Sequence, residues 1–392
     1  MTNDQPGLGH FHFLLSPLTP MGLTVTEVKN RRELREFIYV PAQVNRTNPL
    51  WIPPIYMDDW KFFDAKKNRA FGYADTVLAL ARRDGRVVGR IMGIVNRRCN
   101  ELRQECTGRF GFLECYEEQD VFSALIAFVE NWARGLGMKK LVGPMGFSDQ
   151  DPQGFLYEGF DHEPTLDSYH NFPYIVRFMD AAGYTKEVDY IDYIVKLSDR
   201  LPEFYEKIAA RMARQKEFRL VEFTKSKELK PYGHRIFGLM NITYQDIYGY
   251  VPMTDAEMDA LAKQYLPVID PRFVKVVLKG EDLVGFFIGI PNMNVGLRKC
   301  KGHLFPFGIL QIMAAMKKSK QLDALLAAIR EDCRGRGIDV LIGAAMMRTA
   351  IAAGFEKIDS HHELETNLKM RAEVERVGGQ IAKRFRIYQK AL

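Results

Sequence analysis

The sequence predicts an α/β protein made of two copies of one structural unit, joined near Asp199–Pro202. Two observations favour this fold. Three pairs of similar segments recur in the same order, and 392 residues are too many for one ordinary hydrophobic core. In each half the segments predict a hairpin, a helix, a strand, a second helix and a terminal strand. We therefore expect domains over residues 21–200 and 201–392, and a tail or upstream extension over residues 1–20.

The first pair of segments predicts a β-hairpin in each half. Ala81–Asn96 (ARRDGRVVGRIMGIVN) and Val277–Asn292 (VLKGEDLVGFFIGIPN) both contain two strand-forming runs around a tight turn with glycine. The matched positions are Gly89 with Gly285, Gly93 with Gly289, and Asn96 with Asn292.

The second pair predicts a helix followed by a strand. Phe122–Leu136 and Val340–Ala353 have helical patterns that end at glycine, which commonly stops a helix. Strands are expected directly afterwards, over Lys140–Gly143 and Lys357–Leu364.

The third pair is the most similar in spacing. Asn171 precedes Gly183 by twelve residues, and Asn367 precedes Gly379 by twelve. Each interval predicts an amphipathic helix. A terminal strand that contains tyrosine is expected after each helix, around Tyr190–Val195 and Phe385–Tyr388.

The composition is typical of a soluble globular protein, with 47% hydrophobic and 27% charged residues. The basic residues behind the net charge of +6 are scattered, which favours a mixed solvated surface, and no nucleic-acid partner is expected. The five cysteines include no CxxC pair, so neither a disulfide framework nor a zinc site is indicated. Because no run of residues has the pattern of a membrane span or a signal peptide, we expect a cytoplasmic protein.

In the second half, a strand, a Gly/Arg loop and a helix N-terminus follow one another. Leu322–Ile329 is an apolar run that predicts a buried strand, and Arg330–Asp339 (REDCRGRGID) leads into the next helix. Glycine permits positive φ, and the free N–H groups of a first helical turn bind anions together with arginine side chains. We interpret this loop as a pyrophosphate site; the alternative is a surface turn with two solvated arginines.

The matching place in the first half is acidic. Glu114–Val121 (ECYEEQDV) puts Glu117 and Glu118 where the second half has its Arg/Gly loop. Carboxylates repel a pyrophosphate. We therefore expect the first half to lack a cofactor site and to shape the pocket for the acceptor.

These motifs resemble those of the GNAT acyltransferase superfamily, in which an R/Q-x-x-G-x-G/A loop cradles the pyrophosphate of coenzyme A. Arg334–Asp339 (RGRGID) carries that pattern, with Asp339 where glycine or alanine is usual. Other segments are similar to a bacterial subfamily of two-domain GNAT-like proteins, so that the resemblance covers nearly all of residues 22–392: Asn48–Pro54, Gly159–Asp161, His170–Tyr174 and Lys383–Tyr388.

The resemblance implies a fold and a cofactor site. The fold would be two tandem GNAT-like domains, each a mixed, mostly antiparallel sheet flanked by helices. Acyl-CoA would be the co-substrate, no metal would be needed, and a backbone N–H of the strand that ends at Ile329–Arg330 would stabilise the oxyanion. The cofactor contacts would be Ile329, Arg330, Arg334, Gly335, Arg336, Gly337, Ile338, Asp339 and Asn367.

The resemblance also implies a reaction. Some members of the subfamily look like bacterial ceramide synthases, which join a fatty acyl group from acyl-CoA to the amine of a sphingoid long-chain base. An N-acyltransferase with a lipid amine as acceptor is therefore expected. Two alternatives stay open: a GNAT acetyltransferase of a small amine or peptide, and a non-catalytic acyl-CoA-binding protein.

The sequence leaves the general base open. Along one expected strand, His361, Glu363 and Glu365 alternate and would share a face, with His362 on the opposite face. This cluster would be able to accept the proton of the attacking amine. A solvated edge strand is the equally weighted alternative.

Two further residues are candidates for proton transfer. His170, beside Asn171 and Tyr174, would approach from the first half, although a lone histidine is more often structural. Tyr248 belongs to an aromatic run that would protonate the leaving thiolate, but packing is the commoner role of such residues.

An apolar segment in the second half has two interpretations. His303–Met316 (HLFPFGILQIMAAM) is followed by Lys317, Lys318 and Lys320. A core helix packed on the sheet is the commoner structure for such a run. The alternative is a lipid-facing or acyl-lining helix, with peripheral contact at the inner face of the membrane.

Overall fold

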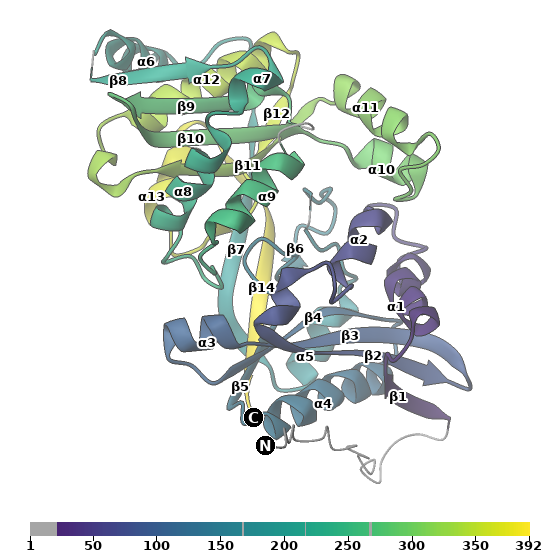
Figure 1. Cartoon of the computed structure of the whole chain (residues 1–392). Coiled ribbons are helices and arrows are strands. Elements are labelled where there is room, and N and C mark those ends of the chain that lie inside the picture. Colours follow the sequence, from purple (N-terminus) through teal and green to yellow (C-terminus); the bar gives the residue numbers. More distant parts are fainter. Residues whose placement is uncertain (1–21, 167, 216, 266–268) are drawn as a thin grey trace.

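The computed structural model describes residues 22–392 except residues 167, 216 and 266–268, and Figure 1 shows two α/β halves, one above the other. The tail expected over residues 1–20 lies outside the described residues.

The first half contains the predicted elements in the predicted order. The hairpin is β2 (Ala74–Arg83) and β3 (Arg86–Asn96), and the helix and strand that follow are α4 (Gln119–Gly135) and β5 (Lys140–Gly143). The other helices and strands are β1 (Leu23–Glu27), α1 (Arg31–Val44), α2 (Tyr56–Phe62), the 3-10 helix Arg69–Gly72, α3 (Arg97–Arg103), β4 (Thr107–Cys115), β6 (Phe155–Glu158), α5 (Tyr174–Ala181) and β7 (Thr185–Lys196).

The second half repeats this order with additional helices. Its hairpin is β9 (Val274–Lys279) and β10 (Asp282–Pro291), and α12 (Ile338–Ala352) matches α4. The other elements are α6 (Glu203–Arg214), β8 (Phe218–Glu222), α7 (Ser226–Leu229), α8 (Gly233–Thr243), α9 (Asp255–Tyr265), the 3-10 helix Pro271–Phe273, α10 (Asn294–Cys300), α11 (Gly308–Lys318), β11 (Gln321–Ile329), the 3-10 helix Glu331–Cys333, β12 (Lys357–Asp359), β13 (Glu363–Leu364), α13 (Leu368–Arg376) and β14 (Gln380–Ala391).

One mixed, mostly antiparallel sheet runs through both halves, in the order β1-β2-β3-β4-β5-β14-β7-β12-β11-β10-β9-β8. Two pairs are parallel, β4 with β5 and β11 with β12. The order is symmetric about its centre when β1 to β5 are matched with β8 to β12 and β14 with β7. The predicted fold class, two copies of one α/β unit flanked by helices, is therefore confirmed.

The two halves meet through an exchange of their last strands. Strand β14 of the second half lies between β5 and β7 of the first, with Tyr388 opposite Gly143 and Lys383 opposite Asp192. Strand β7 in turn pairs with β12. Figure 1 shows these two long strands as the only part of the sheet that links the upper and lower halves among the described residues. Residues on β7 and β14 therefore lie at the centre of the molecule.

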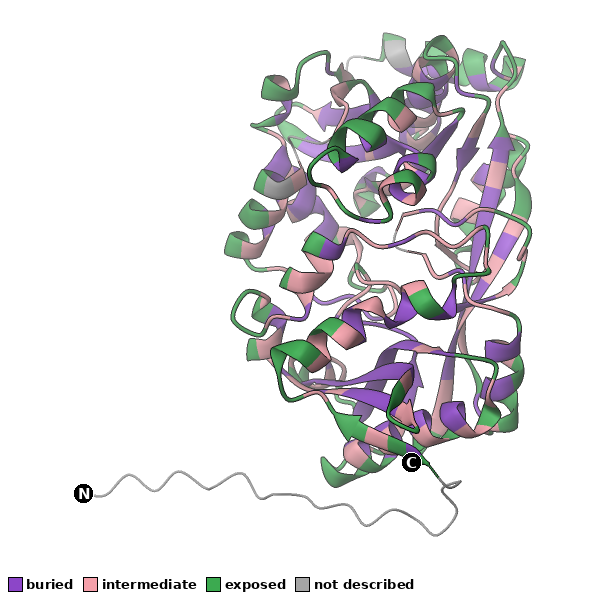
Figure 2. Ribbon diagram, turned by 90° about the vertical axis from the view of Figure 1, so that its right-hand side faces the viewer, coloured by how far each residue is buried: buried purple, intermediate pink, exposed green. Residues whose placement is uncertain are grey.

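Helices cover both faces of the sheet in each half. In the first half α4 and α5 pack on one face and α1 and α2 on the other. In the second half α12 and α6 pack on one face, and α8 and α9 on the other. Figure 2 shows buried strands beneath helices whose outer sides are exposed. Each fully buried Phe or Leu side chain contributes about 1.5–3 kcal/mol to such cores.

The interpretation of His303–Met316 as a core helix is wrong. Residues 303–307 are not helical, and α11 packs on α10 rather than lying on the sheet. Only Gly308 and Ile312 of α11 are buried. Because the segment is apolar on every side, its sequence could not show which face would be covered.

Candidate active site between β11 and β12

An open wedge separates β11 from β12. The two strands pair only where Gln321–Asp323 meets Lys357–Asp359. The chain after β12 then turns towards β7, where Glu363 lies opposite Ile191. Residues 324–326 of β11 are accordingly only partly buried, and Ala327 is exposed. A free strand edge of this kind accepts an extended chain that carries amide groups.

The equivalent wedge of the first half is filled by the protein itself. Strands β4 and β5 pair only over Thr107–Arg109, as in the second half. Beyond that point the backbone N–H of Met145 donates to the carbonyl oxygen of Phe110 at 2.9 Å. The hydroxyl of Tyr169 accepts from the backbone N–H of Phe112 at 3.0 Å. Only the second half therefore offers an open strand edge at this position.

The loop from β11 to α12 has the backbone geometry of an anion site. Gly335 has φ 70° and Gly337 has φ 84°, a region that favours glycine. A side chain at Gly337 would also come within 2.9 Å of the sulfur of Met212. Among the described residues no side chain caps α12, whose first turn begins at Ile338. Its N–H groups remain free for an anion.

The three arginines of this loop differ in their partners. Arg330 is paired with Asp332 at 2.7 Å and with Asp282 at 3.5 Å. Arg336 is paired with Glu217 at 2.6 Å.

Arg334 is exposed, and its Nε donates to the carbonyl oxygen of Ile329 at 3.1 Å. Within the part of the chain that the structure describes, no carboxylate pairs with it. It is thus the loop arginine with the most freedom to bind a phosphate. Asp339, in the first turn of α12, is half-buried and adds a negative charge near the same site.

The expected alternation of the base cluster is wrong in detail. The predicted strand over Lys357–Leu364 is interrupted, because His361 has φ 58° and lies between β12 and β13. The rings of His361 and His362 stack, with centroids 4.5 Å apart and planes 9° apart, instead of lying on opposite faces. Two hydrogen bonds stabilise this positive φ. The backbone N–H of His361 donates to the carboxylate of Asp359 at 3.1 Å, and Nδ1 of the His361 ring lies 2.7 Å from the hydroxyl of Thr165.

A buried charged cluster lies directly beside these histidines. The Nδ1 atom of His362 lies 2.8 Å from Oδ1 of Asp192. The Nζ atom of Lys383 lies 2.8 Å from Oδ2 of Asp359 and 3.2 Å from Oδ2 of Asp192. Lys383 and Asp192 are fully buried, and the opposite ring nitrogen of His362, Nε2, is buried without a hydrogen-bond partner among the described residues. A histidine held by a carboxylate with its other nitrogen free is suited to proton transfer.

Sequence reasoning missed this cluster because its members come from three separate strands and a loop. A usable signal was present at Asp192, a charged residue within the otherwise apolar run Tyr190–Val195. Lys383 is followed by the charged Arg384 and gave no such signal. Buried charges are rare unless they are paired, so such positions predict a partner.

The electrostatics distinguish the candidate bases. Burial, together with the charge of Asp192, raises the pKa of Glu363 to about 8. Burial, with the charge of His362, lowers the pKa of His361 to about 3, so His361 is neutral and weakly basic. Burial alone would raise the pKa of Asp192, but the charges of His362 and Lys383 hold it below its usual range. Of these groups Glu363 has the pKa best suited to accept a proton near neutral pH.

The other predicted site residues lie apart from the wedge or are held by other partners. Glu365 pairs with Lys186. The hydroxyl of Tyr248 donates to Glu187 at 3.0 Å. Asn367 is exposed and accepts from the backbone N–H of Met370 at 3.3 Å as the N-cap of α13.

His170 is buried on the first half and faces Asn48, whose side-chain nitrogen lies 3.1 Å from its Nδ1. Burial lowers the pKa of His170. Tyr244, which belongs to the same aromatic run as Tyr248, does reach the wedge: its hydroxyl donates to the carbonyl oxygen of Ala327 on β11 at 2.9 Å.

Neither a metal cluster nor a membrane-spanning helix is found among the described residues. No group of three or more His, Cys, Asp and Glu side chains is placed to hold a metal ion in that part of the chain. No helix there combines the length and apolar character required to cross a bilayer.

The fold and the site define the class of structure: the chain has the tandem GNAT fold. A tandem GNAT protein from the clavulanic acid biosynthesis pathway superposes with a TM-score of 0.56 at 13% identity, over 94% of this chain and 98% of that protein. This likeness concerns the fold alone.

The resemblance inferred from sequence motifs is confirmed by two full-length relatives. The chain is 29% identical over 384 residues to the bacterial ceramide synthase of Caulobacter vibrioides, covering 95% of this chain and 99% of that protein. It is 25% identical over 370 residues to Protein YghO of Escherichia coli, covering 93% of this chain and 94% of that protein. No protein-family model matches the chain.

Proposed function

We propose that this protein is an N-acyltransferase that moves an acyl group from acyl-CoA to an amine. The observation that carries the proposal is the open wedge beside β11, which leads directly to a glycine-rich loop and an uncapped helix N-terminus. The pyrophosphate would lie at residues 334–339, and the pantetheine would pair with the free edge of β11. The acyl thioester would then lie between β11 and β13, near Glu363.

The proposed reaction is direct aminolysis of the thioester. The amine nitrogen attacks the thioester carbonyl, and a C–N bond forms while the C–S bond breaks. Glu363 takes the proton that the amine loses, and coenzyme A leaves as thiolate and is then protonated. A backbone N–H of β11 stabilises the oxyanion. The cluster of Asp192, Lys383 and His362 positions the segment that carries Glu363.

The proposed acceptor is a long-chain amine, a sphingoid base, so that the product is a ceramide-like amide. This finer assignment is supported by the ceramide synthase among the relatives. We further propose a cytoplasmic protein with peripheral membrane contact. A small-amine acetyltransferase and a non-catalytic acyl-CoA-binding protein are the competing functions.

Only the C-terminal half, within residues 201–392, is proposed to bind acyl-CoA. Replacing Arg334 with glutamate should weaken binding by at least about 100-fold, because one charge-assisted contact is lost and a repelling carboxylate is added. The matched control is Glu117→Ala in the first half, where Glu117 pairs with Arg177 on the exposed surface, and affinity should change little. Titration calorimetry measures both. Two equivalent coenzyme A sites in the unaltered protein would contradict the proposal.

A further inference from the structure

The second half contains a helical insertion that the first half lacks. In the first half, residues 104–106 are enough to join α3 to β4. In the second half, the equivalent connection from α10 to β11 spans residues 301–320 and includes α11. The α10–α11 hairpin (residues 294–318) is therefore not required by the sheet, and its surface calls for a separate explanation.

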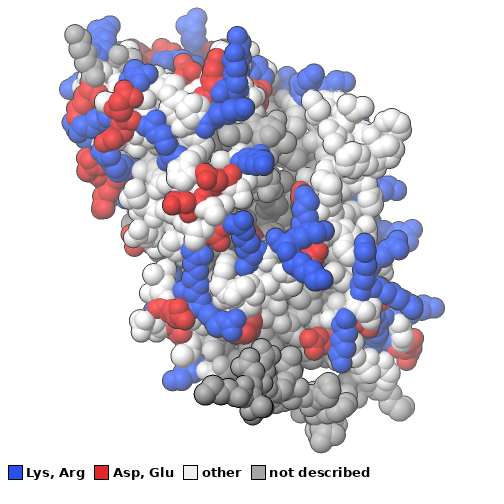
Figure 3. Space-filling model, in the orientation of Figure 1, with Lys and Arg blue, Asp and Glu red and all other residues white. Residues whose placement is uncertain are grey.

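The outer side of this hairpin is apolar and exposed. The exposed fractions reach 71% for Phe305, 65% for Phe307 and 63% for Leu310. Figure 3 shows mostly uncharged surface at the upper right, where Figure 1 places α10 and α11. Large contiguous apolar patches on a soluble protein mark an interaction site. The residues of this patch are Val295, Phe305, Phe307, Ile309, Leu310 and Met313.

The hairpin is fixed firmly enough to present these side chains outward. Gly296 allows close approach of α11, since a side chain there would come within 2.5 Å of the Cα atom of Ile312. His303 lies against Tyr56 of the first half, with ring centroids 5.0 Å apart. The backbone N–H of Tyr56 donates to the carbonyl oxygen of Gly302 at 3.2 Å. The apolar face therefore does not fold back onto the protein.

The charged residues within the segment that forms the patch are all of one sign. Residues 291–320 contain six Lys and Arg and no Asp or Glu. The net charge of this segment is therefore +6, the same as that of the whole chain. Two of the six are neutralised locally, Arg298 by Glu163 and Lys320 by Glu356. No ion pair is seen for the other four among the described residues: Lys299, Lys301, Lys317 and Lys318.

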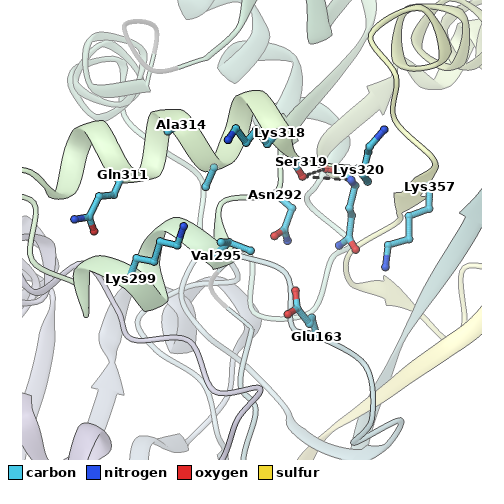
Figure 4. A pocket seen from close by; sticks show the side chains of 12 residues that line it. Glu163, Asn292, Val295, Lys299, Gln311, Ala314, Lys318, Ser319, Lys320 and Lys357 are labelled. Carbon is cyan, nitrogen blue, oxygen red and sulfur yellow. Dashed lines mark hydrogen bonds between the residues drawn. The ribbon is translucent and has the colours of Figure 1, made fainter.

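A cavity of about 390 Å³ adjoins the apolar patch, on the side of α11 that faces the first residues of β11 and β12. Figure 4 shows Lys299, Lys318 and Lys357 around it, from three different elements, together with Glu163. Two of these lysines belong to the hairpin. Cationic groups beside an apolar wall match the phosphate of a phospholipid with its acyl chains.

We infer that the α10–α11 hairpin docks this protein on an anionic phospholipid bilayer, with its apolar side chains in the interface and its lysines on lipid phosphates. An interfacial helix with an apolar outer face and flanking lysines has this chemistry. A protein partner fits less well, because the cores of protein interfaces are depleted in lysine. The inference rests on the proposed function only for its purpose, which is access to a membrane-borne acceptor.

The test is co-sedimentation of the full chain with phosphatidylcholine vesicles, with and without phosphatidylglycerol. We expect binding only to the anionic vesicles, and we expect it to weaken as salt increases. Leu310→Asp should reduce binding at least about tenfold, as should Lys317→Glu combined with Lys318→Glu. The matched control is Leu102→Asp on α3, the first-half counterpart of α10, where the replacement of a leucine with an exposed fraction of 58% should not change vesicle binding. Circular dichroism checks that each variant is folded.

Turnover with a water-soluble amine separates this inference from the proposed function, since Leu310→Asp should leave that turnover unchanged. Equal binding of Leu310→Asp and the unaltered protein to anionic vesicles would overturn the docking surface. An absence of vesicle binding by the unaltered protein would overturn it as well. A change of oligomeric state in Leu310→Asp on gel filtration, without loss of vesicle binding, would also overturn it, because the patch would then serve protein contacts.

Discussion

Replacing Glu363 with glutamine is expected to lower kcat roughly 100- to 10,000-fold, the usual contribution of a general base, while acyl-CoA affinity changes little. Glutamine keeps the size of the side chain and removes its ability to take a proton. Steady-state turnover together with calorimetry separates the two effects. The matched control is Glu365→Gln, since Glu365 is paired with Lys186 outside the wedge and should have a much smaller effect on kcat.

The pH profile supplies a second test of the same residue. A base with a pKa raised to about 8 is ionised above pH 8 and protonated below it, so turnover should fall about tenfold for each pH unit below 8. The midpoint should not move when an acceptor amine with a different pKa is used. If the fall in turnover below pH 8 disappeared in His362→Gln and persisted in Glu363→Gln, the base would be His362 instead.

Replacing Lys383 with methionine is expected to lower the free energy of unfolding by about 3–5 kcal/mol. Lys383 is fully buried between Asp359 and Asp192, and its loss leaves Asp359 without a counter-ion and Asp192 with His362 alone. Urea unfolding followed by circular dichroism measures the change.

Two comparison variants make this stability test specific. Lys207→Met removes an exposed pair with Glu203, and should cost at most about 1 kcal/mol. Adding Asp359→Asn to Lys383→Met should recover part of the loss, because the unpaired charge of Asp359 is removed. If Lys383→Met were as stable as Lys207→Met, the cluster would have no part in holding the two halves together.

The repeat was predictable because it depends on local patterns. The glycine-bearing turns of the hairpins and the glycines after the helices determine these elements within a short stretch of chain. The exchange of β7 and β14 was not predictable in the same way. Strand pairing between Lys383 and Asp192 joins residues far apart in sequence, and the alternation of each strand alone does not identify its neighbours.

The loop proposed to bind the cofactor could be recognised in the sequence, whereas the arrangement of the proposed base could not. The RGRG motif needs only a strand before it and a helix after it, and both are present. The base depends on one residue, His361, whose positive φ turns the chain between β12 and β13. Alternation along a continuous strand was therefore the wrong assumption, and it placed His362 on the wrong side.

The most direct test of the account is a turnover assay with purified protein, a sphingoid base, and acyl-CoA donors from acetyl to palmitoyl. Mass spectrometry of the products and measurement of released coenzyme A are the readouts. We expect an N-acylated long-chain base to form in equal amount to free coenzyme A, to form best with long donors, and to be nearly absent in Glu363→Gln. Preference for acetyl-CoA with a polar amine, and no N-acylated long-chain base, would contradict the long-chain assignment. Binding of acyl-CoA with no amide from any amine would contradict acyl transfer itself.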